Sequence, residues 1–376
     1  DSRIEFGQAV FGKENYAVKS GRNDAVLWPT IARVGAEAGR LASRRRGTEG
    51  STGLSSPKRY LWDENRHQYP WRFNSSYIQN DSEAQATAAP FSNLIDEDGQ
   101  PLYKLPEDDR FPVFVPHYSR SPLMTFMLAE VLTQALCQMN SPAQRARQGQ
   151  TEIPRQLNSI TLTVPPGMAQ AERAILSDRL EEAIVLVWKS LGWHTGEETP
   201  YTAGLDTGVF NPEPSVPMPK TNVEWDEASC GQLVYLFTEI NEHFAGHPEQ
   251  FFKAIMRPDK QRHSDAEKIT LATIDIGGGT TDLVVAEYRL ERGQSTGSNA
   301  SIVPKQLFRD SFKVAGDDIV LDVIQTFVMP SFKRALSVAG ASKLEIDAFT
   351  SVVCGNNQVS MQNQIYRQQL TLQVFV

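Results

Sequence analysis

The residues that could do chemistry gather in the stretch 270–288, where two apolar runs flank a glycine-rich turn. Asp275 precedes the turn and Asp282 follows it. Two carboxylates beside a phosphate site suit Mg²⁺, which takes one or two of them together with water and phosphate oxygens. The turn consists of Gly277, Gly278, Gly279, Thr280 and Thr281. Bare N–H groups in such a turn can hold phosphate oxygens, so the stretch predicts a phosphate-binding β-hairpin. The alternative is a glycine-rich hairpin with solvated aspartates.

The spacing separates this stretch from other phosphate-binding loops. It lacks the G-x-x-x-x-G-K-[ST] pattern, and no glycine stands at the offset that G-x-G-x-x-G requires. The run D-x-G-G-G-T-T-D at 275–282 resembles the second phosphate-binding motif of the actin-like ATPase superfamily, which includes heat-shock chaperones, actins and sugar kinases. That resemblance implies ATP and Mg²⁺ as cofactors, with Asp275 and Asp282 at the metal.

Composition narrows the class of protein. The chain has 376 residues, 40% hydrophobic and 22% charged, which is typical of a globular protein of two domains or one large bilobal one. Its net charge of −8 argues against nucleic-acid binding, which favours a surplus of Lys and Arg. No window is apolar over the roughly 20 residues that a membrane span needs, so we expect no membrane insertion.

Cysteine usage and the chain ends bear on localisation. Cys137, Cys230 and Cys354 are scattered without C-x-x-C spacing, which indicates a reducing compartment such as the cytoplasm. The chain begins at Asp1 without an initiator Met and ends in an apolar run. We therefore expect a fragment, and secretion through an upstream signal stays compatible with this sequence.

Apolar periodicity predicts the elements around the hairpin. Strands are expected at 3–10, 25–34, 111–115, 159–164 and 305–314. Helices are expected at 121–139 and 171–191, from about 227, and from 314 to a break at Pro330, with a loop at 43–57.

Further segments follow the order of the chaperones' motifs. They are Trp28-Pro29-Thr30, Gly35–Ala38, Ser56–Leu61, Thr161–Pro165, Asp226-Glu227 and Gly316-Asp317-Asp318. The resemblance implies that Lys58 faces the γ-phosphate, that Glu227 orders the attacking water, and that Gly316 belongs to the nucleotide site. Lys58 could instead be a surface lysine, and Glu227 an acid favoured at a helix N-terminus. Asp226 is the alternative base if the protein is a small-molecule kinase.

The resemblance also implies the fold: two ribonuclease-H-like α/β lobes, the second truncated, with Mg-ATP between them. The first lobe would be 1–265, with core strands in 1–35 and 111–256 and an insertion at about 36–110. The second would be 266–376, with the hairpin at 270–288 and a helical part at 314–376.

Within the superfamily the whole chain most resembles the SrfB-type bacterial virulence factors. The segments W-P-T-I-A-R-V-G and S-P-K-R-Y-L-W and the tail 367–375 carry that resemblance. Two motifs of the superfamily depart from the pattern. The first phosphate loop should read D-x-G-T, but the nearest match has Glu5 in place of Asp, so the loop is degenerate or lies upstream. We expect the adenosine motif beyond Val376, because Cys354–Asn357 does not match it.

The function implied is ATP hydrolysis that drives a conformational change read by other proteins, with Glu227, Lys58 and Asp275 as the catalytic residues. Three alternatives remain: a non-enzymatic scaffold or nucleotide sensor, a small-molecule kinase, and a filament-forming protein. Fold alone does not choose among them.

Overall fold

The computed structural model describes residues 3–11, 28–44, 52–74, 84–147, 149, 153, 155–194, 216–257, 267–277, 280–291, 300–312 and 314–354. The chain divides into two compact units. Unit 1 comprises Asp1–Ile160, Ala174–Thr221 and Asp322–Val376, and unit 2 comprises Thr161–Arg173 and Asn222–Leu321. The ribonuclease-H-like lobes 1–265 and 266–376 stay a prediction.

The elements of the first half of the chain are mostly short. They are β1 (Arg3–Phe11), β2 (Trp28–Val34), α2 (Gly35–Arg44), β3 (Gly53–Ser55), α3 (Pro122–Met139), α4 (Pro142–Arg147), β4 (Ser159–Thr161), α5 (Gln170–Ser190), and the 3-10 turns η1 (Pro57–Tyr60), η2 (Phe91–Leu94), η3 (Leu102–Lys104) and η4 (Glu107–Asp109). The predicted strand 3–10 and the helices 121–139 and 171–191 are confirmed. The loop predicted at 43–57 contains β3.

Among the described residues, unit 1 contains an antiparallel sheet of β1, β2 and β3. The strand order is β2-β1-β3. Aromatic side chains pack against the central strand, because the ring of Phe6 lies 5.4 Å from Trp71 and 5.9 Å from Tyr118. Phe126 of α3 meets Tyr118 edge to face at 5.0 Å. The segment predicted as an insertion therefore supplies core side chains, since Trp71 is fully buried, whereas Trp62 is half exposed.

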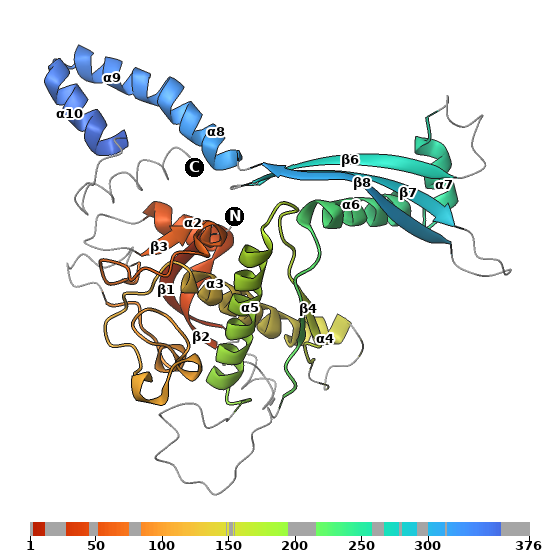
Figure 1. Ribbon diagram of the computed structural model, residues 1–376, viewed down its shortest axis with the longest axis horizontal. Coiled ribbons are helices and arrows are strands. Elements are labelled where there is room, and N and C mark those ends of the chain that lie inside the picture. The colour runs from red at the N-terminus through yellow and green to blue at the C-terminus, as the bar shows by residue number, and fades with distance from the viewer. Residues whose placement is uncertain are drawn as a thin grey trace, which may run out of the picture. The chain divides into compact units, whose positions relative to one another are not determined.

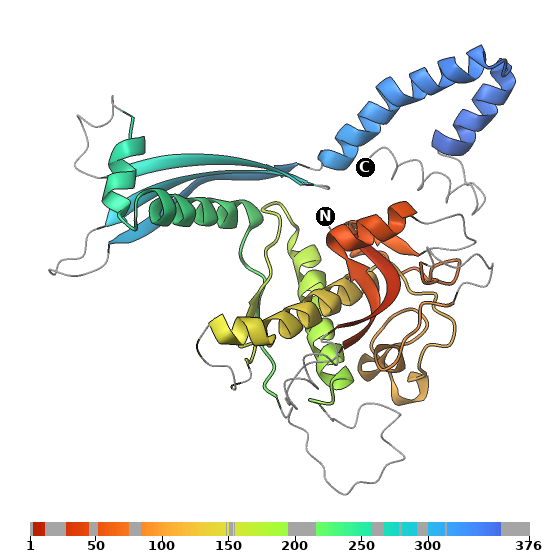
Figure 2. The same cartoon turned by 180° about the vertical axis from the view of Figure 1, so that it is seen from behind.

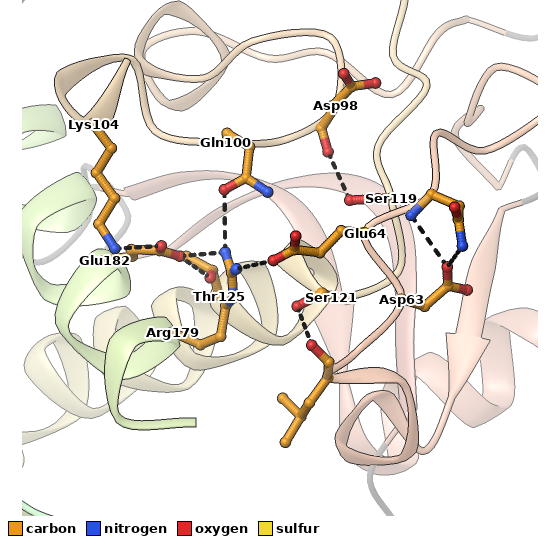
Figure 3. Close-up of polar contacts among 12 residues, drawn as sticks. Asp63, Glu64, Asp98, Gln100, Lys104, Ser119, Ser121, Thr125, Arg179 and Glu182 are labelled. Atoms are coloured by element: carbon orange, nitrogen blue, oxygen red, sulfur yellow. Dashed lines mark hydrogen bonds and ion pairs between the residues drawn. The ribbon is translucent and has the colours of Figure 1, made fainter. Parts of the chain in front are cut away.

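A buried acid, Glu182 on α5, ties three parts of unit 1 together (Figure 3). Its Oε2 accepts hydrogen bonds from Thr125 Oγ1 on α3 and Arg179 Nη1, both at 2.8 Å. Its Oε1 accepts from Lys104 Nζ at 2.8 Å. Arg179 also donates to Gln100, at 3.4 Å. Charged donors on both oxygens compensate the burial of the carboxylate.

The described elements of the second half are longer strands and helices. They are β5 (Lys220–Asn222), α6 (Glu227–Thr238), the π-helical turn η5 (Glu239–His243), α7 (Pro248–Ile255), β6 (Lys268–Ile276), β7 (Thr281–Glu291), β8 (Ser301–Phe312), α8 (Gly316–Val323), the π-helical turn η6 (Ile324–Val328), α9 (Met329–Val338) and α10 (Lys343–Cys354). The hairpin predicted at 270–288 is confirmed as β6 and β7. A small two-stranded sheet pairs β4 with β5.

Unit 2 is built on the antiparallel sheet β6-β7-β8, and α6 runs along one face of it (Figures 1 and 2). Apolar side chains between α6, α7 and the sheet form its core: Leu236, Ile240, Phe251, Phe252, Ile269, Ala286, Tyr288 and Leu290. A buried amide orients α6, because Gln232 Nε2 donates to Val284 O at 3.2 Å while its Oε1 accepts from the Tyr288 hydroxyl at 2.9 Å.

Two local predictions are wrong. Residues 111–115 form no strand, and the side chains of Phe111 and Phe114 are exposed, so no apolar face fixes a pleat there. Pro330 does not break the helix, which continues from α8 through η6 into α9. The wider π turn contains the carbonyl four residues before Pro330, and that widening relieves the clash a proline ring makes in an α-helix.

Replacing the Glu182 carboxylate should destabilise the protein strongly. Glu182→Ala removes the buried partner of Arg179 and leaves it only Glu64, an exposed acid whose Oε1 lies 3.6 Å from Arg179 Nη2. Removing one partner of a buried ion pair typically costs about 3–5 kcal/mol. Denaturant unfolding of the variant measures this loss. Glu181→Ala is the matched control, because Glu181 is exposed on the same helix, and we expect it to change stability by at most about 0.5 kcal/mol. Equal unfolding midpoints for the two variants would contradict this account.

Candidate functional site

The hairpin places its two aspartates directly opposite each other. In the register of β6 and β7, Asp275 pairs with Asp282, and Asp282 in turn pairs with Ser311 on β8. Directly opposed residues share a face of the sheet, so the three side chains form one cross-strand row. Asp275 is exposed, whereas Asp282 is 2% exposed. The Asp275 carboxylate is therefore accessible to a ligand, whereas that of Asp282, on the neighbouring strand, is covered.

Asp282 differs from the other buried acids of the described chain in its partners. Those acids all have a basic partner: Glu5 pairs with Arg3, Glu130 with Arg33, and Glu182 with Arg179 and Lys104. Asp282 instead accepts hydrogen bonds from two hydroxyls, Ser311 Oγ at 2.5 Å and Thr280 Oγ1 at 3.2 Å. Within the residues that the structure describes, it makes no ion pair.

This arrangement is electrostatically unfavourable on its own. A buried charge is costly unless it is paired, and like charges directly opposite across a sheet repel. Two neutral hydroxyl donors stabilise the Asp282 carboxylate but leave its charge, and that of Asp275, uncancelled. A cation beside the two carboxylates would offset both costs.

The turn between the strands is fastened to the start of α8. Gly277 N donates to Thr280 O at 2.8 Å, and Gly316 N donates to Gly277 O at 2.9 Å. Thr281 Oγ1 donates to Val314 O at 2.6 Å. The N–H groups of Gly277 and Gly316, both predicted to bind nucleotide, thus make internal hydrogen bonds that hold the turn at the helix. Gly278 and Gly279, also predicted to bind nucleotide, lie outside the described residues.

The predicted acidic helix start is the N-terminus of α6. Asp226 is its N-cap, with Oδ1 accepting from Ser229 N at 2.7 Å. Glu227 is the first residue of the helix, half-buried, and its N–H donates to Val164 O at 2.9 Å. Burial raises the pKa of the Cys230 thiol, and the charges of Asp226 and Glu227 raise it further.

The segment that follows Val164 contacts the cross-strand row of Asp275, Asp282 and Ser311, called the acid row below, although it is distant in sequence. A Cβ built on Gly167 would lie 2.4 Å from Ser311 Cβ, so the Pro-Pro-Gly turn packs directly on that serine. Unit 2 thereby brings together the hairpin, the start of α8, the turn at 165–167 and, through Val164, the start of α6.

Lys58 lies in unit 1, where it is half-buried in the 3-10 turn η1. The turn follows Ser56, whose φ of 51° is left-handed. The predicted contact of Lys58 with a γ-phosphate stays a prediction.

Glu5, the acid nearest to the expected first phosphate loop, is a core residue of unit 1. Its Oε1 accepts from Thr52 Oγ1 at 2.5 Å and from Asn74 Nδ2 at 2.9 Å. A Cβ on Gly53 would meet its Oε2 at 2.1 Å, so β3 needs glycine there. Glu5 is thus engaged in holding β1, β3 and Asn74 together.

Two further surveys cover the described residues. No group of three or more His, Cys, Asp or Glu side chains there is placed to hold a metal ion. A pair of carboxylates with water and phosphate oxygens would still meet the usual needs of Mg²⁺. In the same residues, every helix is too short or too polar to cross a membrane.

Sequence reasoning missed Ser311 and Gly167. Both follow from strand register and packing, which the local sequence does not encode. The alternation of β8 could have shown which of its residues share a face, but not which of them lies opposite Asp282.

Fold and site define a protein of mixed helices and strands with an acid-edged glycine hairpin as its candidate site. The chain belongs to the family of the virulence factor SrfB, whose family model matches residues 1–376. A search of curated proteins found no match.

The cap geometry of Asp226 leads to a test of its role. Asp226→Ala should lower the free energy of unfolding by about 0.5–2 kcal/mol, because α6 loses its N-cap, whereas Asp226→Asn should preserve stability. Thermal or denaturant unfolding of both variants measures this. If a kinase-type base is needed at this position, Asp226→Asn would abolish phosphoryl transfer while leaving the protein as stable as the wild type.

Proposed function

We propose that this SrfB-family chain binds a nucleotide with Mg²⁺ at the β6–β7 hairpin. The observation that carries the proposal is the pair Asp275 and Asp282, opposed across the sheet with no ion pair among the described residues. The other buried acids of the described chain have basic partners, so this pair is the one whose charge calls for an external cation.

The parts of the proposed site have distinct tasks. Asp275, the exposed acid, would hold the metal's water ligands. The negative charge of Asp282, on the neighbouring strand, would strengthen the attraction of the site for the cation. Thr280 donates to Asp282 and Thr281 to Val314, so these two hydroxyls hold the residues that follow the glycines against the sheet and the start of α8. The positive end of the α8 dipole lies beside this turn and would favour an anion. Bound Mg-nucleotide would supply the charge that neutralises the two acids.

Hydrolysis is the proposed use of the nucleotide. Glu227 would hold the attacking water, since it is a carboxylate at the first residue of α6, linked through Val164 to the turn that packs on Ser311. Positioning and charge stabilisation supply most of the catalysis in phosphoryl transfer. Lys58 and a shape change read by other proteins belong to this proposal through the superfamily resemblance alone.

A second function, nucleotide sensing without hydrolysis, is favoured by Glu5. If the segment at Glu5 is the first phosphate loop, its acid is already bound to Thr52 and Asn74 and is not free to serve a metal. The protein would then bind nucleotide and present the bound state to a partner.

Charge removal at Asp275 tests the proposal. In the full-length protein, Asp275→Asn should weaken Mg²⁺-dependent ATP binding by about tenfold or more, the usual effect of losing an interaction with a charged group. Titration calorimetry with and without Mg²⁺ measures this. Glu291→Gln is the control, because Glu291 is an exposed acid at the far end of β7.

Two results would decide between the functions. Phosphate release in a single turnover supports hydrolysis, and binding without release supports sensing. The same Mg²⁺ dependence in Asp275→Asn and wild type would overturn the proposed site.

A further inference from the structure

Ser311 contacts Asp282 in a way that restricts the carboxylate. Ser311 Oγ donates to Oδ1, and Thr280 Oγ1 donates to Oδ2, so each oxygen has one hydroxyl donor. The carboxylate cannot rotate about its Cβ–Cγ bond without losing both hydrogen bonds. The remaining lone pairs of Asp282 therefore keep a fixed direction.

Ser311 is itself held from two sides. Its N–H donates to Asp310 Oδ1 at 2.8 Å, and β8 pairs it in register with Asp282. The Pro165-Pro166-Gly167 turn packs on it so closely that an added Cβ at Gly167 would lie 2.4 Å from Ser311 Cβ and 3.1 Å from its Oγ. Real Cβ atoms do not approach other atoms to 2.4 Å, so residue 167 must lack a side chain while Ser311 stays in this place.

We propose that Ser311 is a positioning residue of the metal-nucleotide site. Gly167 packs against Ser311 and, because it has no side chain, leaves the space that the serine occupies. This inference rests on the proposed function. Ser311 touches neither metal nor nucleotide in this scheme. Ser311 orients Asp282, whose negative charge together with that of Asp275 attracts Mg²⁺. The turn at 165–167 keeps the Ser311 hydroxyl directed at the Asp282 carboxylate.

The scheme predicts a defect confined to the metal. Ser311→Ala in the full-length protein should raise the Mg²⁺ concentration needed for half-maximal ATP binding by roughly 10- to 100-fold, the effect of losing one hydrogen bond to a charged group. Binding of ATP in EDTA should stay unchanged, because no phosphate contact is lost. Ser301→Ala, an exposed serine at the other end of β8, should match the wild type in both assays.

Gly167→Ala tests the packing of residue 167 against Ser311 without altering any acid or hydroxyl. It should shift the Mg²⁺ requirement in the same direction as Ser311→Ala, and the double variant should be no worse than the more affected single variant, because both changes break one contact. Gly231→Ala is the matched control, since a Cβ at Gly231 meets no atom within 4 Å.

The outcomes distinguish the role of Ser311 from the proposed binding of nucleotide and Mg²⁺. A Mg²⁺ requirement unchanged by Ser311→Ala, a parallel loss of binding with and without metal, or additive effects of the two substitutions would each overturn the role of Ser311. They would leave the proposed site intact if Asp275→Asn still loses Mg²⁺ dependence. Wild-type protein that binds no ATP would overturn both.

Discussion

The candidate site in unit 2 depends on a buried carboxylate, that of Asp282, placed opposite a second acid. β6, β7 and β8 bring Asp275, Asp282 and Ser311 into one cross-strand row. Burial and like-charge repulsion both oppose this arrangement, whereas hydroxyl hydrogen bonds to Asp282 offset part of the cost. The cation of the proposed Mg-nucleotide would offset the rest of this cost.

The other buried acids make the contrast clear. Glu182 in unit 1 has a lysine, an arginine and a hydroxyl on its two oxygens, and it joins α3, α5 and the segment before them (Figure 3). Glu130 has Arg33. These carboxylates are neutralised within the protein, and their role is to hold elements together. Structural acids in the described part of this chain thus have basic partners, whereas Asp282 has hydroxyl partners alone.

Packing around the acid row comes from segments far apart in sequence. Gln232 fixes α6 on the sheet by binding a backbone carbonyl of β7 and the Tyr288 hydroxyl, whose pKa is raised by its burial and by the charge of Asp226. Gly316 joins the hairpin turn to α8, and Gly167 lies against Ser311. The hairpin is therefore part of a supported structure and not an isolated loop.

Local sequence determined the elements themselves: the glycine hairpin, the helices α3 and α5, and the start of α6 near residue 227 follow from periodicity, turn chemistry and helix-end preferences. Membership of the SrfB family was also predictable from the sequence, through segments distributed along the whole chain. The tertiary structure alone decided that Asp282 is buried while Asp275 is exposed, that Ser311 binds Asp282, and that residue 167 must be glycine. These facts depend on strand register and on contacts between residues more than a hundred positions apart, and a pattern within one segment does not encode such contacts.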